Sequence, residues 1–288
     1  MTGDVAVVGL GLIGGSLARD LAGCGVRVSA YDTDRAALAT AVEEGVVARV
    51  LDADLDGIER HDAVVIATPV DVAGDILRAA AHRLRRVPLV TDVCSTKMSV
   101  VTAARESGLR ERFVGGHPLA GDHRSGWTAS RPGLFRGAPV YLCPAEPEAT
   151  ARAQVLWTMV GGVTEFIEPG EHDDLLAHTS HLPQVVSTAL MRTLLSAGVD
   201  AAQLGPGGRD MTRIAHSPAA LWTGIALDNA DRLGDAVLGL VSELVQLRYA
   251  LDRRDADGLR RFFELRPDVP GAWSATLADE GAPVVPGA

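Results

Sequence analysis

Three glycines near the start of the chain place the strongest constraint on its fold. Gly9, Gly11 and Gly14 form a G-x-G-x-x-G pattern between the runs DVAVVGL and LIGGSLARDLAGCG, which predict a strand and a helix. In that setting the glycines permit a tight turn and let a pyrophosphate approach the free amides at the helix start. The sequence therefore predicts a dinucleotide site, formed by Gly9, Gly11, Leu12, Ile13 and Gly14.

An acidic residue follows at the distance that such a site requires. The next predicted strand, VRVSAYD, ends at Asp32, about 20 residues beyond the glycines. A carboxylate there can accept hydrogen bonds from ribose hydroxyls and would repel a 2′-phosphate, which favours NAD as the cofactor. Arg35 leaves NADP open, since its guanidinium can reach a phosphate, although a solvated side chain also explains it.

Strands and helices then alternate, which predicts an α/β fold with a doubly wound, mainly parallel sheet. The predicted strands are DAVVIATPV, PLVTDV, RFVGG, PVYLC and VTEFI, and the predicted helices are DVAGDILRAAAHRL and STKMSVVTAARESG, the second capped by Ser95. Ligands of such sheets lie beyond the carboxyl ends of the strands. Thr68, Pro69, Ser95 and His117 each follow a predicted strand, so we expect them to converge beside the nicotinamide.

From about residue 169 the sequence changes character, because apolar residues recur at helical spacing and strand-like runs are absent. We expect a dinucleotide-binding domain over residues 1–168, a helical substrate and dimerisation domain over 169–275, and a disordered tail over 276–288. An apolar stripe in the last long helix is typical of a core or a subunit contact, which favours a homodimer. Its members are Leu233, Val237, Leu240, Val241, Leu244 and Leu251.

The composition argues against several classes of partner. With 37 acidic and 27 basic residues the formal net charge is −10, so we expect no binding of nucleic acid. Glycines, Arg19 and Asp20 interrupt the apolar N-terminal stretch before it reaches a membrane-spanning length, so no membrane segment is expected. Cys24, Cys94 and Cys143 form no CxxC pair, which predicts no metal site, no disulfide framework and a cytoplasmic protein.

His117 stands in the stretch GGHPLAG, directly after an apolar run that predicts a strand. An isolated histidine in such a turn is commonly a structural hydrogen-bond partner. A dehydrogenase that oxidises an alcohol, however, needs a base of near-neutral pKa to take the hydroxyl proton as hydride leaves the carbon. Residue type and position alone leave both interpretations open.

Five stretches together resemble the prephenate/arogenate dehydrogenase family of tyrosine biosynthesis. They are GLGLIGGSLA, DVCSTK, GGHPLAGDHRSG, HDDLLAHTSHLPQ and GGRDMTRIAHSPAALW, in the order and near the spacing typical of that family, over roughly residues 4–265. The resemblance implies an oxidoreductase that oxidises the ring hydroxyl of prephenate or arogenate with NAD(P). Carbon dioxide is lost as the ring becomes aromatic, and the product is 4-hydroxyphenylpyruvate or tyrosine.

The resemblance also implies roles for particular residues. His117 corresponds to the catalytic histidine of the family, and Ser95 to a serine that orients it. Arg213 corresponds to the arginine that holds a substrate carboxylate; it lies on a largely apolar segment, where burying an unpaired charge would be costly. His181 corresponds to a histidine of the substrate pocket, and Asp173, eight residues earlier, to its supporting carboxylate.

Three further positions concern the substrate pocket. Asp210 and Trp222 correspond to residues that line it, although helix capping and helix packing explain them as well. Gln184 departs from relatives that prefer prephenate, which often carry a second histidine there. A neutral amide can accept a hydrogen bond from the ammonium of arogenate, whereas a protonated histidine would repel it. We therefore expect a preference for arogenate, with prephenate as the other substrate.

Rival interpretations come from two classes. Other dehydrogenases with a similar domain pair, such as 3-hydroxyacid dehydrogenases and imine reductases, lack the HPxAG and TRIA stretches found here. A relative acting on 4-amino-4-deoxyprephenate is nearer, but His117 favours a hydroxyl substrate. A regulator that binds NAD without catalysis is the alternative outside enzymes, and the intact Ser95, His117 and Arg213 argue against it.

Overall fold

The computed structural model describes residues 3–121 and 124–264, so the expected tail over 276–288 lies outside the described residues. Contacts divide the chain into one compact unit of residues 1–236 and a second unit that begins at Val237. Within the described ranges, no helix is both long enough and apolar enough to cross a membrane.

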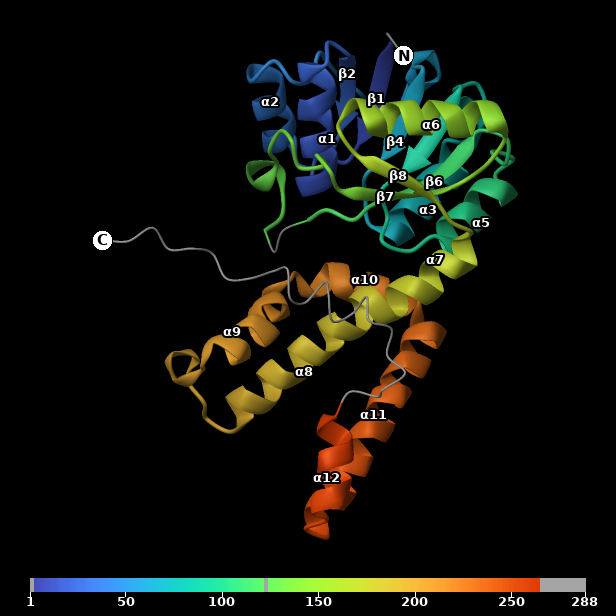
Figure 1. Cartoon of the computed structure of the whole chain (residues 1–288). Coiled ribbons are helices and arrows are strands. Elements are labelled where there is room, and N and C mark those ends of the chain that lie inside the picture. Colours follow the sequence, from blue (N-terminus) through green and yellow to red (C-terminus); the bar gives the residue numbers. More distant parts are fainter. Residues whose placement is uncertain (1–2, 122–123, 265–288) are drawn as a thin grey trace. The chain divides into compact units, whose positions relative to one another are not determined.

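A single sheet forms the centre of the first unit (Figure 1). In the described residues it has eight strands in the order β3-β2-β1-β4-β5-β6-β7-β8, and every neighbouring pair is parallel except β6 with β7. The strands are β1 (Asp4–Val8), β2 (Arg27–Tyr31), β3 (Arg49–Val50), β4 (Ala63–Ile66), β5 (Leu89–Asp92), β6 (Phe113–Pro118), β7 (Pro139–Cys143) and β8 (Val163–Phe166). Because β1 lies between β2 and β4, the chain reverses direction across the sheet there, which confirms the doubly wound, mainly parallel fold.

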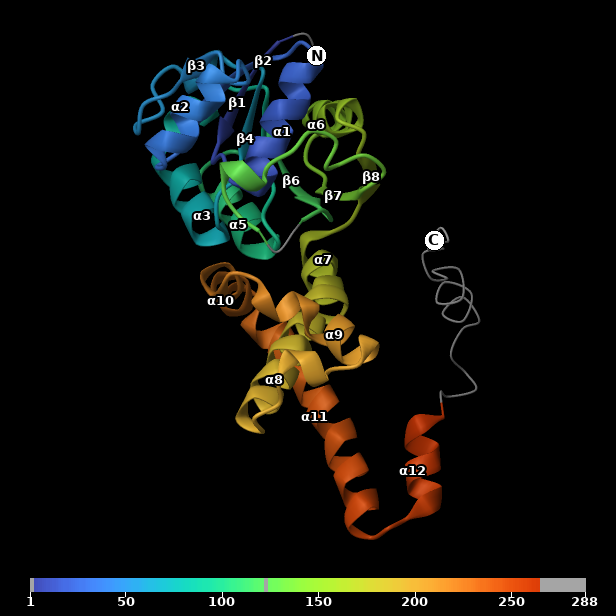
Figure 2. The ribbon, with the colours of Figure 1, turned by 90° about the vertical axis from the view of Figure 1, so that its left-hand side faces the viewer.

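Helices cover both faces of this sheet, and the strands supply a separate apolar core to each (Figures 1 and 2). Val5 and Val7 of β1 belong to one core, whereas Ala6 and Val8 belong to the other, because successive strand residues point to opposite faces. The first core includes residues of α1 (Leu12–Gly23), α2 (Arg35–Glu43) and α6 (Pro147–Met159), and the second includes residues of α3 (Val70–Ala79), α4 (Ala81–Leu84) and α5 (Met98–Glu106). A sheet buried on both faces explains why its strands are apolar without alternation.

The chain continues as helices after β8. In the described residues they are α7 (Pro169–Leu176), a π-helical turn (Ala177–His181), α8 (Leu182–Ser196), a 3₁₀ turn (Ala201–Gln203), α9 (Pro206–Thr212), a second 3₁₀ turn (Arg213–His216), α10 (Ala219–Asp228), α11 (Ala230–Asp252) and α12 (Ala256–Phe263). Helix α7 contacts α5, and α10 contacts α3, so both belong to the same compact unit as the sheet. The domain boundary at residue 168 stays a prediction.

The structure differs from the sequence-based expectation at two places near the sheet edge. Ser95 is not the cap of α5, which begins at Met98; Asp173 of α7 satisfies the free amides of Lys97 and Met98 instead, at 2.7 and 2.9 Å. His117 does not lie in a turn after β6 but within that strand, because it pairs with Tyr141 of the antiparallel strand β7.

Candidate functional site

The three glycines of the first turn differ in what surrounds them. A Cβ atom added at Gly9, whose φ is +101°, would lie 2.3 Å from the carbonyl oxygen of Ala67, and one at Gly14 would lie 2.0 Å from that of Gly9. Close packing of backbone therefore requires glycine at both positions. A Cβ at Gly11, directly before α1, would meet nothing within 4 Å. The space beside Gly11 and the free amides of α1 fit a pyrophosphate group.

Asp32 lies just beyond the end of β2 and is bound to this turn. Its carboxylate accepts hydrogen bonds from the backbone amides of Leu10 at 2.5 Å and Asp34 at 2.7 Å. A carboxylate has more acceptor positions than these two amides use, so it can also accept from ribose hydroxyls. Thr68 and Pro69 follow β4 in the same region: Gly9 lies close to Thr68, and Pro69 precedes the first residue of α3.

His117, near the carboxyl end of β6, is 8% exposed, and its ring is joined to a second histidine. Nδ1 of His117 lies 2.8 Å from Nε2 of His172, a fully buried residue of α7. Nδ1 of His172 lies 2.8 Å from Oδ1 of Asp173. The result is a buried chain of two imidazoles and a carboxylate, which links the sheet to the first helix after it. His172 was not among the site residues predicted from the sequence.

A buried ion pair lies beside this chain of groups. The Lys97 ammonium binds the Asp92 carboxylate and donates to the carbonyl oxygen of Gly116 at 2.7 Å, and both charged side chains are fully buried. Asp92 also accepts from the amides of Gly116 at 3.0 Å and Cys94 at 2.9 Å. The pair therefore fixes the backbone directly before His117 and the loop before α5. Lys97 too was missing from the predicted site residues.

Burial and neighbouring charges favour a neutral His117. Burial lowers the pKa of His117 well below its ordinary value, and the nearby His172, Lys97 and His181 lower it further. Burial also lowers the pKa of His172, although the hydrogen bond to Asp173 opposes this. For the Asp173 carboxyl, burial alone would raise the pKa, but the bonds from His172, Met98 and Lys97 outweigh it and lower the pKa. The charged end of the chain is therefore Asp173, and both rings are neutral.

His181 belongs to the same cluster, at the end of the π-helical turn. It is 1% exposed, burial lowers its pKa to about 4, and its ring stands edge-on to Trp222 with centroids 6.1 Å apart. In the described part of the chain its Nε2 is buried without a hydrogen-bond partner. A substrate oxygen at that position would satisfy it.

Within the described residues Asp173 makes no hydrogen bond to His181, whereas the resemblance implies that it supports that ring; its charge nevertheless raises the pKa of His181 against the effect of burial. The Asp173 carboxylate is engaged by His172 and the start of α5, and the π-helical turn separates α7 from His181. Asn229 connects the two residues instead: its Nδ2 donates to the carbonyl oxygen of Asp173 at 2.8 Å and lies 3.3 Å from Nδ1 of His181.

The other predicted substrate residues lie farther along the helices. Gln184 is buried, and its Nε2 donates to the carbonyl oxygen of Ile214 at 3.0 Å, next to Arg213. Arg213 and Asp210 line a cavity of about 320 Å³ together with Ser187, whose buried hydroxyl has no partner in the described residues. Arg213 is exposed, so its charge is not buried as its apolar segment suggested, and no contact among the described residues joins it to His117.

Ser95 lies in the loop between β5 and α5 and is half-buried. Within residues 3–121 and 124–264 it makes no hydrogen bond to His117, whose Nδ1 is bound by His172. The structure thus brings together His117, His181 and Asp173, places Trp222 against His181, and leaves the orienting role of Ser95 a prediction.

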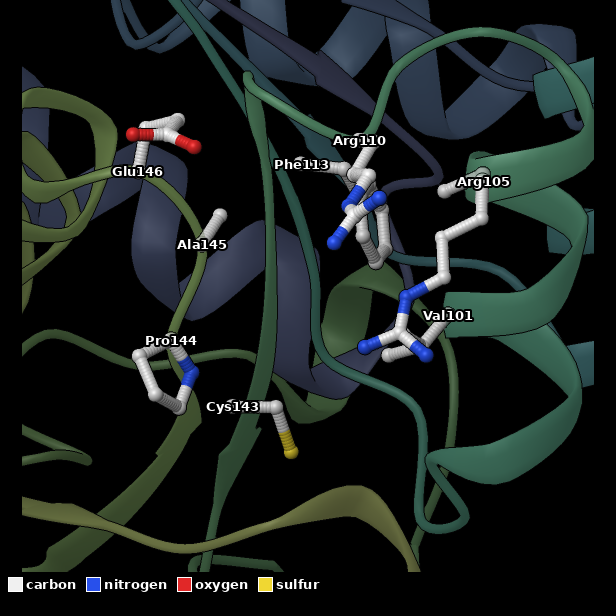
Figure 3. Close-up of a pocket in the computed structure, with 9 residues that line it drawn as sticks. Val101, Arg105, Arg110, Phe113, Cys143, Pro144, Ala145 and Glu146 are labelled. Atoms are coloured by element: carbon white, nitrogen blue, oxygen red, sulfur yellow. The ribbon is translucent and has the colours of Figure 1, made fainter.

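A different cavity lies at the opposite end of β6 (Figure 3). It measures about 180 Å³ and is lined by Arg105 of α5, Arg110, Phe113 and Cys143, among others. Phe113 begins β6, whereas His117 lies near its end, so this cavity is not part of the histidine cluster. Burial raises the pKa of the Cys143 thiol to about 12, which makes it unreactive at neutral pH.

Comparisons with known proteins agree with the resemblance seen in the sequence. Two sequence models of one family match the chain: prephenate dehydrogenase, nucleotide-binding domain, over residues 17–166, and prephenate dehydrogenase, dimerization domain, over 168–265. Prephenate dehydrogenase of Bacillus subtilis is 34% identical over 279 residues, which covers 93% of this chain and 75% of the relative. Cyclohexadienyl dehydrogenase of Zymomonas mobilis is 33% identical over 272 residues, which covers 90% of this chain and 92% of the relative.

The fold is similar over almost the whole chain as well. The crystal structure of prephenate dehydrogenase from Aquifex aeolicus, in complex with hydroxyphenyl propionate and NAD+, gives a TM-score of 0.82 at 29% identity and covers 96% of each chain. Both domain models, the curated relatives and this structure lead to one conclusion: the chain belongs to the prephenate dehydrogenase family of oxidoreductases.

Proposed function

We propose that the protein catalyses the NAD-dependent oxidative decarboxylation of arogenate to tyrosine, of prephenate to 4-hydroxyphenylpyruvate, or of both, with His117 as the base. The observation that carries the proposal is the neutral, buried imidazole of His117 near the carboxyl end of β6. Ligands of a doubly wound sheet bind at this edge, beside the glycine turn and Asp32. The names of the relatives support the substrate class, since both compounds are cyclohexadienyl carboxylates.

The chain's own residues account for the proton and the charges of this reaction. Bound NAD supplies the acceptor for the hydride that leaves ring carbon C4. His117 takes the proton of the 4-hydroxyl group, and the bond between C1 and its carboxylate breaks, releasing carbon dioxide. The electron pair of that bond completes the aromatic ring, and the phenolate regains a proton as product forms. The protein therefore has to orient the ring, accept one proton and hold the carboxylates.

Residues of the helices hold the substrate in this proposal. Arg213 makes no ion pair in the described residues and binds a substrate carboxylate in a charge-assisted contact. His181 offers its unpartnered Nε2 to a substrate oxygen, and Trp222 packs against that ring. Asp210 lines the cavity beside Arg213, and Ser95 helps to orient the ring hydroxyl near the nicotinamide.

Cofactor choice gives a first testable prediction. Asp32→Asn removes the negative charge while retaining an oxygen for the amide of Leu10, so the ratio of kcat/KM with NAD to that with NADP should fall about tenfold. Steady-state kinetics with both cofactors measure this ratio. If the wild type uses NADP as well as NAD, Arg35 rather than Asp32 determines the choice, and Arg35→Ala should then abolish the use of NADP.

Substrate choice gives the experiment that tests the function itself. The Nε2 of Gln184 is held by Ile214, which leaves its amide oxygen as an acceptor for the ammonium of arogenate. We expect wild-type kcat/KM to be higher with arogenate than with prephenate, and Gln184→His to shift the ratio about tenfold towards prephenate. Turnover of neither compound would reject the proposed function, whereas an unchanged ratio would remove only Gln184 from the argument.

Assembly and cellular location complete the proposal. The matched dimerization domain, together with exposed side chains on the last long helix such as Leu244 and Leu251, supports a homodimer formed through the helical segments. Cys24, Cys94 and Cys143 are free thiols, which fits a cytoplasmic enzyme.

A further inference from the structure

The buried contact between His117 and His172 determines which nitrogen of each ring carries a proton. Asp173 holds a carboxylate that already accepts from the amides of Lys97 and Met98, so Nδ1 of His172 must be the donor in their 2.8 Å contact. A neutral imidazole carries one proton, and Nε2 of His172 is therefore an acceptor. The 2.8 Å contact then requires a proton on Nδ1 of His117.

This order of donors leaves Nε2 of His117 unprotonated. An imidazole with the opposite tautomer would place two acceptors against each other at His172 and would have no lone pair for a substrate hydroxyl. We propose that His172 is a positioning residue, an inference that rests on the proposed role of His117 as base. His172 fixes the Nδ1–H tautomer of His117 and stabilises the imidazolium that forms when His117 takes the substrate proton. Asp173 anchors His172 in turn.

The surroundings of the two rings support this assignment. His172 is fully buried, and the ring of Tyr141 stands edge-on to it with centroids 5.8 Å apart, so the ring cannot rotate freely. The other ionisable groups that act on His117 are Lys97, from the loop before α5, and His181, from the π-helical turn. His181, whose pKa is about 4, is neutral at neutral pH, but the charged Lys97 would repel an imidazolium at His117. A neutral acceptor backed by the Asp173 carboxylate offsets this repulsion during proton transfer.

The test compares His172→Leu, which removes the acceptor, with His172→Gln, whose amide oxygen can accept from Nδ1 of His117. His61 provides the matched control, because it is also buried and bonded through both ring nitrogens, to Ile58 and Ser29, in a different part of the sheet. We expect His172→Leu to lower kcat about 10²-fold with little change in KM or in NAD affinity. The kcat of His172→Gln should be at least about tenfold higher than that of His172→Leu. His61→Leu and His61→Gln should keep the wild-type kcat.

A second readout does not depend on activity. Nitrogen-15 NMR of the full-length enzyme labelled at histidine, with His117→Asn to assign the signals, reports which nitrogen of His117 is protonated. We expect a protonated Nδ1 in the wild type and a mixture of tautomers in His172→Leu. A proton on Nε2 in the wild type, or full kcat in a folded His172→Leu variant, would overturn the proposal. Failure of the proposed function shows differently, as undiminished turnover by His117→Asn.

Discussion

Replacing His117 with asparagine is expected to lower kcat about 10²-fold or more, the usual contribution of a positioned base. Asparagine keeps a polar side chain of similar reach at this position in β6, so the strand should remain intact. The nucleotide turn lies on a different strand, and NAD affinity should stay at the wild-type value. Steady-state kinetics and a fluorescence titration with NAD measure the two quantities separately.

The pH dependence of the wild type gives the matching test. Catalysis needs a neutral His117, and burial together with His172, Lys97 and His181 lowers its pKa well below the ordinary value of 6.5. His117 therefore becomes protonated only at a pH well below 6.5. As the pH is lowered, kcat/KM should stay constant past pH 6.5 and fall only in more acidic solution. Turnover that persists in His117→Asn, or an acid limb that survives this substitution unchanged, would assign the proton to another group.

Replacing Lys97 with methionine is expected to cost about 3 to 5 kcal/mol of the free energy of unfolding. Methionine fills a similar volume but leaves the Asp92 carboxylate fully buried with only the amides of Gly116 and Cys94 as donors. Burial alone would lower the pKa of the Lys97 ammonium, but Asp92, together with Cys94 and Cys143, outweighs burial and raises it, so Lys97 is charged when folded. Chemical denaturation measures the loss.

The double variant Asp92→Asn with Lys97→Met is the control for this second prediction. It removes both charges, so a large part of the lost stability should return, since most of the cost is that of the unpaired carboxylate. Arg248→Met, which breaks an exposed pair with Asp252, should cost less than about 1 kcal/mol. A Lys97→Met variant as stable as wild type would show that the loop before α5 relaxes to admit water.

Much of the fold follows from local pattern. The apolar runs before Gly9 and around Ala63 predicted strands because a sheet covered on both faces needs continuous apolar segments, and β1 and β4 are such strands. The short strand β3 and helices α6 and α9 were not predicted. The two residues of β3 are both exposed, and α6 carries apolar residues on several sides, so neither shows a clear period.

The site could be predicted only where a residue follows directly from its position in a motif. Asp32 and the glycines lie where the strand–turn–helix pattern placed them. His172 was missed, although it stands in the quoted stretch HDDLLAHTSHLPQ, because its role depends on a contact with His117, 55 residues away in sequence. Lys97 was missed for the same reason: only the folded sheet shows that its charge is buried against Asp92.

The link between His117 and His172 also affects how this enzyme can be recombined with its relatives. The two family models meet between residues 166 and 168, so His117 lies in the first and His172 with Asp173 in the second. A chimaera joined between residues 166 and 168 would take His117 from one parent and His172 with Asp173 from the other. A crossover placed after α7 keeps the imidazole pair and its carboxylate from a single parent, so the useful unit of exchange extends one helix beyond the nucleotide-binding domain.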